Sequence, residues 1–273
     1  MKLKFNRPFL ILIFGLVLAF SLNALAGDFS ASFGVGYEAL QLENSSGYKD
    51  KTSTLLSSAT IDWAFLPAFD ILLNLEQGST KSAEIDSGFS HPLHNLKGHY
   101  NRQVLALNYY LGNTFRLGLG LGLDIDREEF TWTGDNDDTL LRYWQWNRNS
   151  LGVSSLVSLV YQDDRFGFKT SFSYTPFFKS DETLVAFIDE AWEAWQTESL
   201  KTTLLKANTE ATINLTHNFG ILGGVSYRRY QSPAYNVPSL YENSDGEKRE
   251  VDSLASKVLE KGSFVYLGLK LTI

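Results

Sequence analysis

Residues 29–38 read FSASFGVGYE, and almost every second residue of this stretch is large and apolar. The intervening residues are Ser, Gly and Glu, so the pattern has a period of two. Successive side chains of a β-strand point to opposite faces, which makes one face of this strand apolar and the other small or polar. The apolar face suits lipid, and the other face suits a wet and crowded lumen.

The end of the chain repeats this pattern, because residues 265–273 read VYLGLKLTI. Eight more segments between the two ends have strand-like composition or alternation. They cover about 53–65, 70–78, 100–111, 115–133, 141–161, 166–180, 199–217 and 219–231. The sequence therefore predicts about ten strands.

The breaks between these segments alternate strictly between short and long. Short breaks fall at 66–68, 112–113, 163–164 and 217–218, and long polar breaks fall at about 43–52, 79–99, 134–140, 181–198 and 232–262. This alternation is typical of transmembrane barrels, with short periplasmic turns and long external loops. A soluble β-sandwich would have more uniform turns and a polar outer face. The predicted fold is all-β, a transmembrane antiparallel up-and-down β-barrel.

Two of the long breaks show helical spacing. Between residues 184 and 195, apolar residues recur every three or four positions, and acidic residues occupy much of the other face. Apolar residues at 251–259 repeat in the same way before Gly262, which could cap a helix. We expect an amphipathic helix in each loop, lying over the rim of the barrel.

The first 26 residues have the features of a secretory signal peptide. Three basic residues precede an apolar run at 9–22, and residues 24–26 (ALA) form a small-x-small cleavage site. The expected organisation is a signal peptide at 1–26 and an outer-membrane β-barrel with long extracellular loops at 27–273. The expected location is the outer membrane.

Charge and composition restrict the function further. Without the three basic residues of the signal, 21 Lys and Arg face 31 Asp and Glu, a net charge near −10. Such a chain lacks the basic face that nucleic-acid binding needs, so no nucleic-acid partner is expected. The chain has no cysteine, which excludes disulfides, a thiol nucleophile and a lipidated cysteine anchor.

Several short motifs carry a resemblance to a known family. Residues 61–67 read IDWAFLP, His91-Pro92 precedes Leu96, and residues 239–241 read SLY. With the run from Gly122 to Gly134 and the ending GLKLTI, these motifs resemble in order and spacing the omptin family of ten-stranded outer-membrane proteases. The resemblance implies an omptin-like barrel and, as an expectation, an aspartic-type endopeptidase of the cell surface.

The resemblance also implies a catalytic site of carboxylates and a histidine that together activate a water. Glu84 and Asp86 offer a carboxylate pair on the second external loop, and Asp181 matches an aspartate on the fourth. Thr183 stands where the family has its catalytic histidine. The candidate catalytic residues are Glu84, Asp86 and Asp181, and the alternative is that all three are solvated loop acids.

Arg127 occupies the position of a family arginine that contacts a phosphate of lipid A, so the resemblance implies lipopolysaccharide as a partner and activating lipid. Leu123 and Ile125 replace the tyrosine and glutamate that accompany it in the family. The alternative is a rim arginine that extends to the lipid headgroups. No metal and no other cofactor is predicted.

The sequence is compatible with three functions: an omptin-like endopeptidase, a non-enzymatic surface adhesin or receptor, and a small porin. The second would bind peptides or host and surface proteins through its external loops. The porin ranks last because ten strands leave a narrow lumen. Charged residues are expected to fill part of that lumen with ion pairs, among them Asp62, Glu76, Lys169, Glu210 and Arg228.

Overall fold

A computed structural model describes residues 28–43, 49–80, 95–134, 142–188, 192–236, 240–250 and 255–272. The expected signal peptide lies outside these residues, and its cleavage stays a prediction. Among the described residues no helix is long and apolar enough to cross a membrane.

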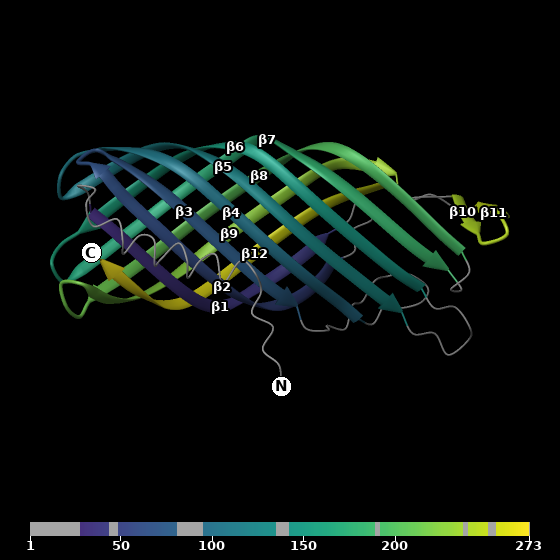
Figure 1. Cartoon of the computed structure of the whole chain (residues 1–273), viewed down its shortest axis with the longest axis horizontal. Coiled ribbons are helices and arrows are strands. Elements are labelled where there is room, and N and C mark those ends of the chain that lie inside the picture. Colours follow the sequence, from purple (N-terminus) through teal and green to yellow (C-terminus); the bar gives the residue numbers. More distant parts are fainter. Residues whose placement is uncertain are drawn as a thin grey trace.

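Ten long antiparallel strands form a closed ring (Figure 1). They are β1 (Asp28–Glu43), β2 (Lys49–Leu66), β3 (Phe69–Thr80), β4 (Asn95–Leu111), β5 (Phe115–Gly134), β6 (Arg142–Gln162), β7 (Phe166–Ile188), β8 (Trp192–Asn214), β9 (Phe219–Asn236) and β12 (Ala255–Thr272). Each strand pairs with the next, and the pairing of β1 with β12 closes the barrel. Two short strands, β10 (Leu240–Asn243) and β11 (Lys248–Glu250), form a hairpin beyond one end.

The predicted barrel of ten strands is confirmed, and the four short turns lie where the sequence placed them. The strands are longer than predicted at the opposite end. Seven strands extend there by several residues beyond their predicted ends, namely β1, β2, β4, β7, β8, β9 and β12.

The prediction of helices in two loops is wrong for the residues that the structure describes. β7 continues to Ile188 and β8 starts at Trp192, with Thr183 opposite Thr197 in a regular ladder. The second predicted helix is replaced by the start of β12 at Ala255, while 251–254 lie outside the described residues. Pairing with neighbouring strands overrides the helical spacing, because β-branched and aromatic residues such as Val185 and Phe187 also suit a strand.

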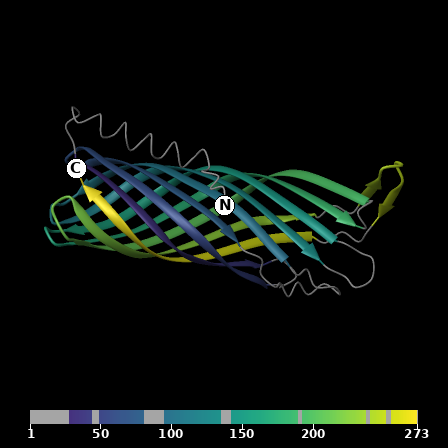
Figure 2. The ribbon, with the colours of Figure 1, turned by 60° about the horizontal axis from the view of Figure 1, so that its bottom comes forward.

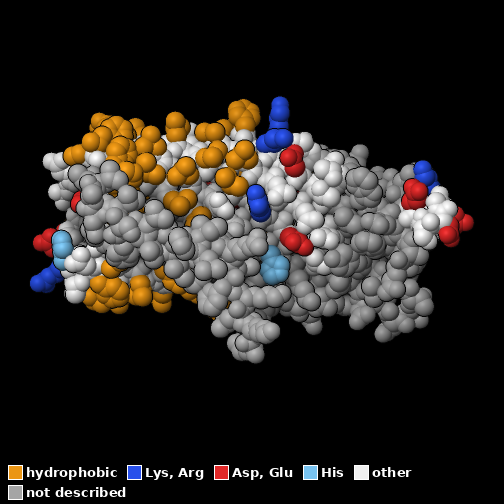
Figure 3. Space-filling model, viewed as in Figure 1, with side chains coloured by type: hydrophobic (Ala, Val, Ile, Leu, Met, Phe, Trp, Pro, Cys, Tyr) orange, Lys and Arg blue, Asp and Glu red, His pale blue; other side chains and the backbone are white. Residues whose placement is uncertain are grey.

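Apolar side chains form a band around the outside of the turn-containing half of the barrel (Figure 3). Along most strands, exposed apolar residues alternate with buried or half-buried residues that face the lumen, whereas the apolar residues of β3 are half-buried. Members of the band include Leu105, Leu107, Leu117, Leu119, Leu121, Val153, Phe172, Ile221, Val265, Leu267 and Leu269. This band is the lipid-facing surface.

The strands continue well past the apolar band. On β5 the outward residues change from Leu123 to Arg127 and Glu129, and on β7 they change from Phe177 to Lys179 and Asp181. The 23 residues of β7 at about 3.3 Å each span roughly 76 Å, which a tilt of about 40° shortens to roughly 58 Å along the barrel axis. An apolar band is about 25 Å tall, so roughly 30 Å of polar wall stands outside the membrane.

The turn between β6 and β7 shows how the membrane-proximal ends are fixed. Asp163 Oδ1 accepts hydrogen bonds from the amides of Arg165 at 2.8 Å and Phe166 at 2.6 Å. Tyr161 Oη donates to the other carboxylate oxygen at 2.7 Å. The bond from Tyr161, followed by those from the two amides, lowers the pKa of Asp163 below its usual range.

Barrel closure depends on a close approach between the first and last strands. Gly36 lies opposite Tyr266, and a Cβ atom at this glycine would collide with the backbone of Val265 and Tyr266. Gly268 makes a similar approach to the backbone around Phe33. The absence of a side chain at these positions lets β1 and β12 pair closely.

We therefore expect Gly36→Ala to weaken closure by about 1–3 kcal/mol, because a backbone contact cannot relax cheaply. The folded fraction, measured by the faster migration of unheated barrel in detergent gels, should fall. Gly167→Ala is the matched control, because a Cβ there meets Thr212 at an ordinary 3.5 Å. Equal loss in both variants would contradict this account of closure.

Candidate functional site

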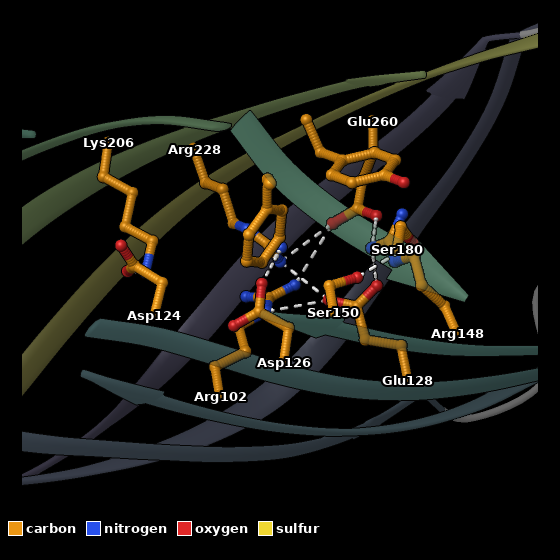
Figure 4. A network of polar contacts seen from close by, with 12 residues as sticks. Arg102, Asp124, Asp126, Glu128, Arg148, Ser150, Ser180, Lys206, Arg228 and Glu260 are labelled. Carbon is orange, nitrogen blue, oxygen red and sulfur yellow. Dashed lines mark hydrogen bonds and ion pairs between the residues drawn. The ribbon is translucent and has the colours of Figure 1, made fainter. Parts of the chain in front are cut away.

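The lumen is crossed by a cluster of buried charges, which we call the ionic plug (Figure 4). It consists of Glu38, Arg102, Asp126, Glu128, Arg148, Arg228 and Glu260, from six different strands. Each of these residues is 5% exposed or less. The plug lies on the lumen face just beyond the level of the apolar band.

Arg102 forms the centre of the plug and contacts three carboxylates. Its Nη1 donates to Glu38 Oε1 at 2.9 Å, and its Nε donates to Glu128 Oε1 at 3.1 Å. Its Nη2 donates to Glu260 Oε1 at 3.3 Å. One guanidinium therefore ties β4 to β1, β5 and β12.

The other two arginines share the same acids. Arg148 Nη2 donates to Glu260 Oε2 at 2.5 Å and also contacts Glu128. Arg228 Nη1 donates to Glu128 at 2.7 Å and to Glu260 at 3.2 Å, and its Nη2 contacts Asp126. Glu128 and Glu260 thus each contact all three arginines, so the plug is a network rather than a set of separate pairs.

The plug holds three positive and four negative groups, and Glu76 approaches Arg102 at 3.9 Å. Charges buried to this degree persist only when they are paired and hydrogen-bonded. Their density at one level of a narrow lumen leaves no room for a water-filled channel among the described side chains.

A layer of aromatic residues covers the plug on the side away from the turns. The guanidinium of Arg102 lies 4.5 Å from the centre of the Tyr100 ring, and that of Arg148 lies 3.8 Å from the Tyr230 ring. Phe178 packs edge-on against Tyr230, with ring centres 6.2 Å apart. Tyr230 Oη also donates to Glu182 at 2.5 Å. An aromatic layer therefore lies directly above the ionic one.

Below the plug lies a cavity of about 700 Å³. Its lining runs from the turn residues Asp163, Asp164 and His217 up to Arg102 and Arg228. Because short turns mark the periplasmic end, this cavity opens toward the periplasm and ends at the plug. We call it the periplasmic vestibule.

Polar pairs line the vestibule walls. Lys169 Nζ lies 3.4 Å from Asp62 Oδ2, and Tyr266 Oη donates to Glu210 at 3.0 Å. The prediction of ion pairs inside the barrel is confirmed for Lys169 with Asp62 and for Arg228 in the plug.

The structure describes only one of the three residues that were predicted to form a catalytic site. Glu84 and Asp86 lie outside the described residues. Asp181 is about half exposed on the outer wall of β7, where its carboxylate lies 3.6 Å from Lys179 Nζ. Its neighbour Glu182 is the residue that points into the lumen. A catalytic role of these acids stays a prediction.

Arg127 is also exposed on the outer wall, where the sequence placed it. It lies opposite Asn149 of β6, which in turn lies opposite Asp181 of β7. Arg127 and Asp181 are therefore two strands apart at the same level, about 10 Å from each other. His91 of the His-Pro motif lies outside the described residues, and His99 faces outward from β4.

Arg127 belongs to a larger set of basic residues on the outer wall just past the apolar band. The other members are Lys179, Lys201, Arg229 and Lys261. Lys179 lies directly opposite Lys201 on β8, and Arg229 lies directly opposite Lys261 on β12. Like charges in direct cross-strand positions are unfavourable, so these pairs make the wall a surface that attracts anions.

Sequence reasoning missed most of the plug. Glu38, Arg102, Asp126, Glu128, Arg148 and Glu260 were not singled out, although all have the strand parity of lumen residues. A charged residue placed between two outward apolar residues, such as Asp124 between Leu123 and Ile125, is the signal that marks this face.

We expect Glu260→Gln to destabilise the barrel by about 3–5 kcal/mol, because it leaves three buried arginines with one carboxylate fewer. The urea midpoint of unfolding from lipid vesicles measures this change. The control is Glu129→Gln, which alters an exposed outward residue of β5 that accepts a bond from Gln145. If both variants shifted the midpoint equally, the plug would not be the stabilising element described above.

No family model matches the sequence, and neither does any curated protein. Similar solved structures include the translocator domain of the autotransporter NalP from Neisseria meningitidis, with 12% identity, a TM-score of 0.48, and 95% of this chain and 94% of that chain covered. The attachment invasion locus protein Ail of Yersinia pestis shows 12% identity and a TM-score of 0.30 over 89% and 98% of the two chains. A FadL homologue of Pseudomonas aeruginosa shows 9% identity and a TM-score of 0.32, with 89% of this chain and 90% of that chain covered. Likenesses this distant do not inform function.

The closed ring of strands, its external apolar band and the short turns at one end define an outer-membrane β-barrel. The protein accordingly resides in the outer membrane, with the polar wall and the β10–β11 hairpin on the outer side.

Proposed function

We propose that this protein is a surface-exposed binding barrel of the receptor or adhesin class. The observation that carries the proposal is that a polar wall of roughly 30 Å continues past the apolar band while the lumen is closed at the same level. A wall this tall has no use in crossing the membrane. Its function is to hold a binding surface above the lipid headgroups.

The two competing functions have less support. A porin needs a continuous lumen, and the plug and the aromatic layer close this one. An omptin-like endopeptidase needs carboxylates and a base at one mouth, and Asp181 faces the outside instead. We propose that the omptin resemblance reflects ancestry and barrel shape rather than catalysis.

In planar bilayers, the refolded barrel should give no steady open-channel current. In a separate assay with a quenched peptide library that includes dibasic sites, it should release no fluorescence. The same peptides immobilised on an array should retain folded barrel, and a heat-unfolded sample is the control. A steady current would favour the porin. Peptide cleavage by the wild type that disappears in Asp181→Ala would favour the protease.

We also propose that the basic residues of the outer wall bind phosphates of lipopolysaccharide in the outer leaflet. Arg127, Lys179 and Arg229 stand just past the apolar band, at the expected level of the headgroups. A guanidinium can bind a phosphate with two parallel hydrogen bonds. This partner is proposed from the position and charge of these side chains.

Arg127→Ala should weaken binding of lipopolysaccharide about fivefold, since one basic residue near an anionic surface contributes about 1 kcal/mol. The measurement is titration of detergent-folded barrel with purified lipopolysaccharide. Arg165→Ala serves as control, because Arg165 is exposed in a periplasmic turn. Equal affinities of the wild type and the Arg127 variant would contradict a role of this side chain.

A further inference from the structure

At the outer edge of the apolar band, the wall of β3 to β6 carries a set of carboxamide side chains, which we call the amide face. Its members are Gln77, Asn101, Gln103, Gln145, Asn147 and Asn149, and each is exposed or half-exposed. They come from β3, β4 and β6, while β5 adds Arg127 and Glu129 between them. Figures 1 and 2 show these strands lying side by side along the barrel.

The register of the strands arranges this part of the wall in rows. The first row consists of Gln77, Asn101, Arg127 and Asn149, and the second of Ser79, His99, Glu129 and Asn147, each residue directly opposite the next. Leu151 of the apolar band lies two residues below the first row. Two residues of strand advance about 6.6 Å, or about 5 Å along the axis of a barrel tilted by about 40°. The rows therefore lie about 5 and 10 Å above the edge of the band.

Hydrogen bonds within the wall orient several of these amides. Gln103 Nε2 donates to Asn101 Oδ1 at 3.1 Å, and Gln145 Nε2 donates to Glu129 Oε1 at 3.0 Å. A carboxamide has two N–H donors and a carbonyl oxygen with two lone pairs. One such bond therefore fixes the direction of a side chain and leaves most of its capacity for a ligand.

The wall next to the amide face differs in chemistry at the same height. There β7, β8 and β9 carry the exposed basic residues Lys179, Lys201 and Arg229. One side of the wall thus attracts anions, and the other side offers uncharged donors and acceptors. Arg127 lies where the two chemistries meet, because it stands directly opposite Asn149.

The height of the amide face indicates its neighbours in the membrane. In an outer leaflet of lipopolysaccharide, the core sugars begin directly above the phosphates of lipid A. Each sugar hydroxyl donates one hydrogen bond and accepts others, which is the pattern that a carboxamide complements. A neutral amide can also bind a neutral sugar without removing a charge from water, which would be costly.

We propose that the amide face binds the core oligosaccharide of lipopolysaccharide. This inference rests on the proposed binding of lipopolysaccharide phosphates by the basic residues, and it names the part of the glycolipid that the uncharged side chains recognise. Asn147 and Asn149 contact the sugars, and Arg127 beside them contacts a phosphate of the same molecule.

The test uses the refolded barrel in detergent and two purified ligands, lipopolysaccharide with a complete core and lipid A without core sugars. Titration should show that the wild type binds lipopolysaccharide about tenfold more tightly than lipid A. This factor corresponds to three neutral hydrogen bonds that contribute about twofold each. Because it compares two ligands on one protein, the result does not depend on the folding of a variant.

The double variant Asn147→Ala and Asn149→Ala should weaken binding of lipopolysaccharide about fivefold and leave binding of lipid A unchanged. Gln162→Ala is the matched control, because it removes an exposed carboxamide at the periplasmic end of the same strand. It should change neither affinity. Arg127→Ala should weaken binding of both ligands by the same factor, since both carry the phosphates.

Equal affinity of the wild type for the two ligands would overturn the proposal. An equal loss for both ligands in the double variant would also overturn it, and so would a neutral glucan that competes as well as the free core oligosaccharide. In each of these cases, binding of lipid A that depends on Arg127 would still support the phosphate contacts. The two proposals therefore fail separately.

Discussion

The structure depends on one constraint: a backbone inside lipid has no water to pair with, so each strand must find a neighbour on both sides. The ring closed by β1 and β12 meets this constraint within the apolar band. Beyond the band, water can pair with the backbone, and the constraint is relaxed. The regular ladder between β8 and β9 ends at Thr203 and Gln231 in that outer region, where a shorter ladder is compatible with a stable barrel.

The closed ring also encloses a lumen, which side chains of the barrel must fill. Ten strands leave room for side chains but little more, and this sequence fills the middle with arginines and acids rather than with apolar groups. The plug then divides the interior into a periplasmic vestibule and an outer part covered by aromatic rings. A solute that enters the vestibule from the periplasmic end therefore meets the plug.

Period-two alternation made the fold predictable, because it reports directly which side of a strand faces lipid. The external ends were less predictable, since residues 184–195 satisfy helical spacing as well as strand composition, and only pairing with a neighbour decides between them. Strand parity could have placed Asp181 on the outside and Glu182 on the inside. It could not have brought Arg102 of β4 next to Glu260 of β12, because that contact depends on how the ring closes.

The composition of the plug also bears on how the barrel assembles. Arg102 is joined to Glu38, 64 residues earlier in the chain, and to Glu260, 158 residues later. Of the four acids of the plug, two come from β5 and the other two from the first and last strands, so the full set of acids surrounds the arginines only when the ring closes. The final strand thus supplies the last counter-ion at the same moment as the last backbone ladder. An incomplete sheet lacks both a backbone ladder and a counter-ion for its buried arginines. Both costs disappear when the ring closes, so insertion and closure should proceed as a single concerted step.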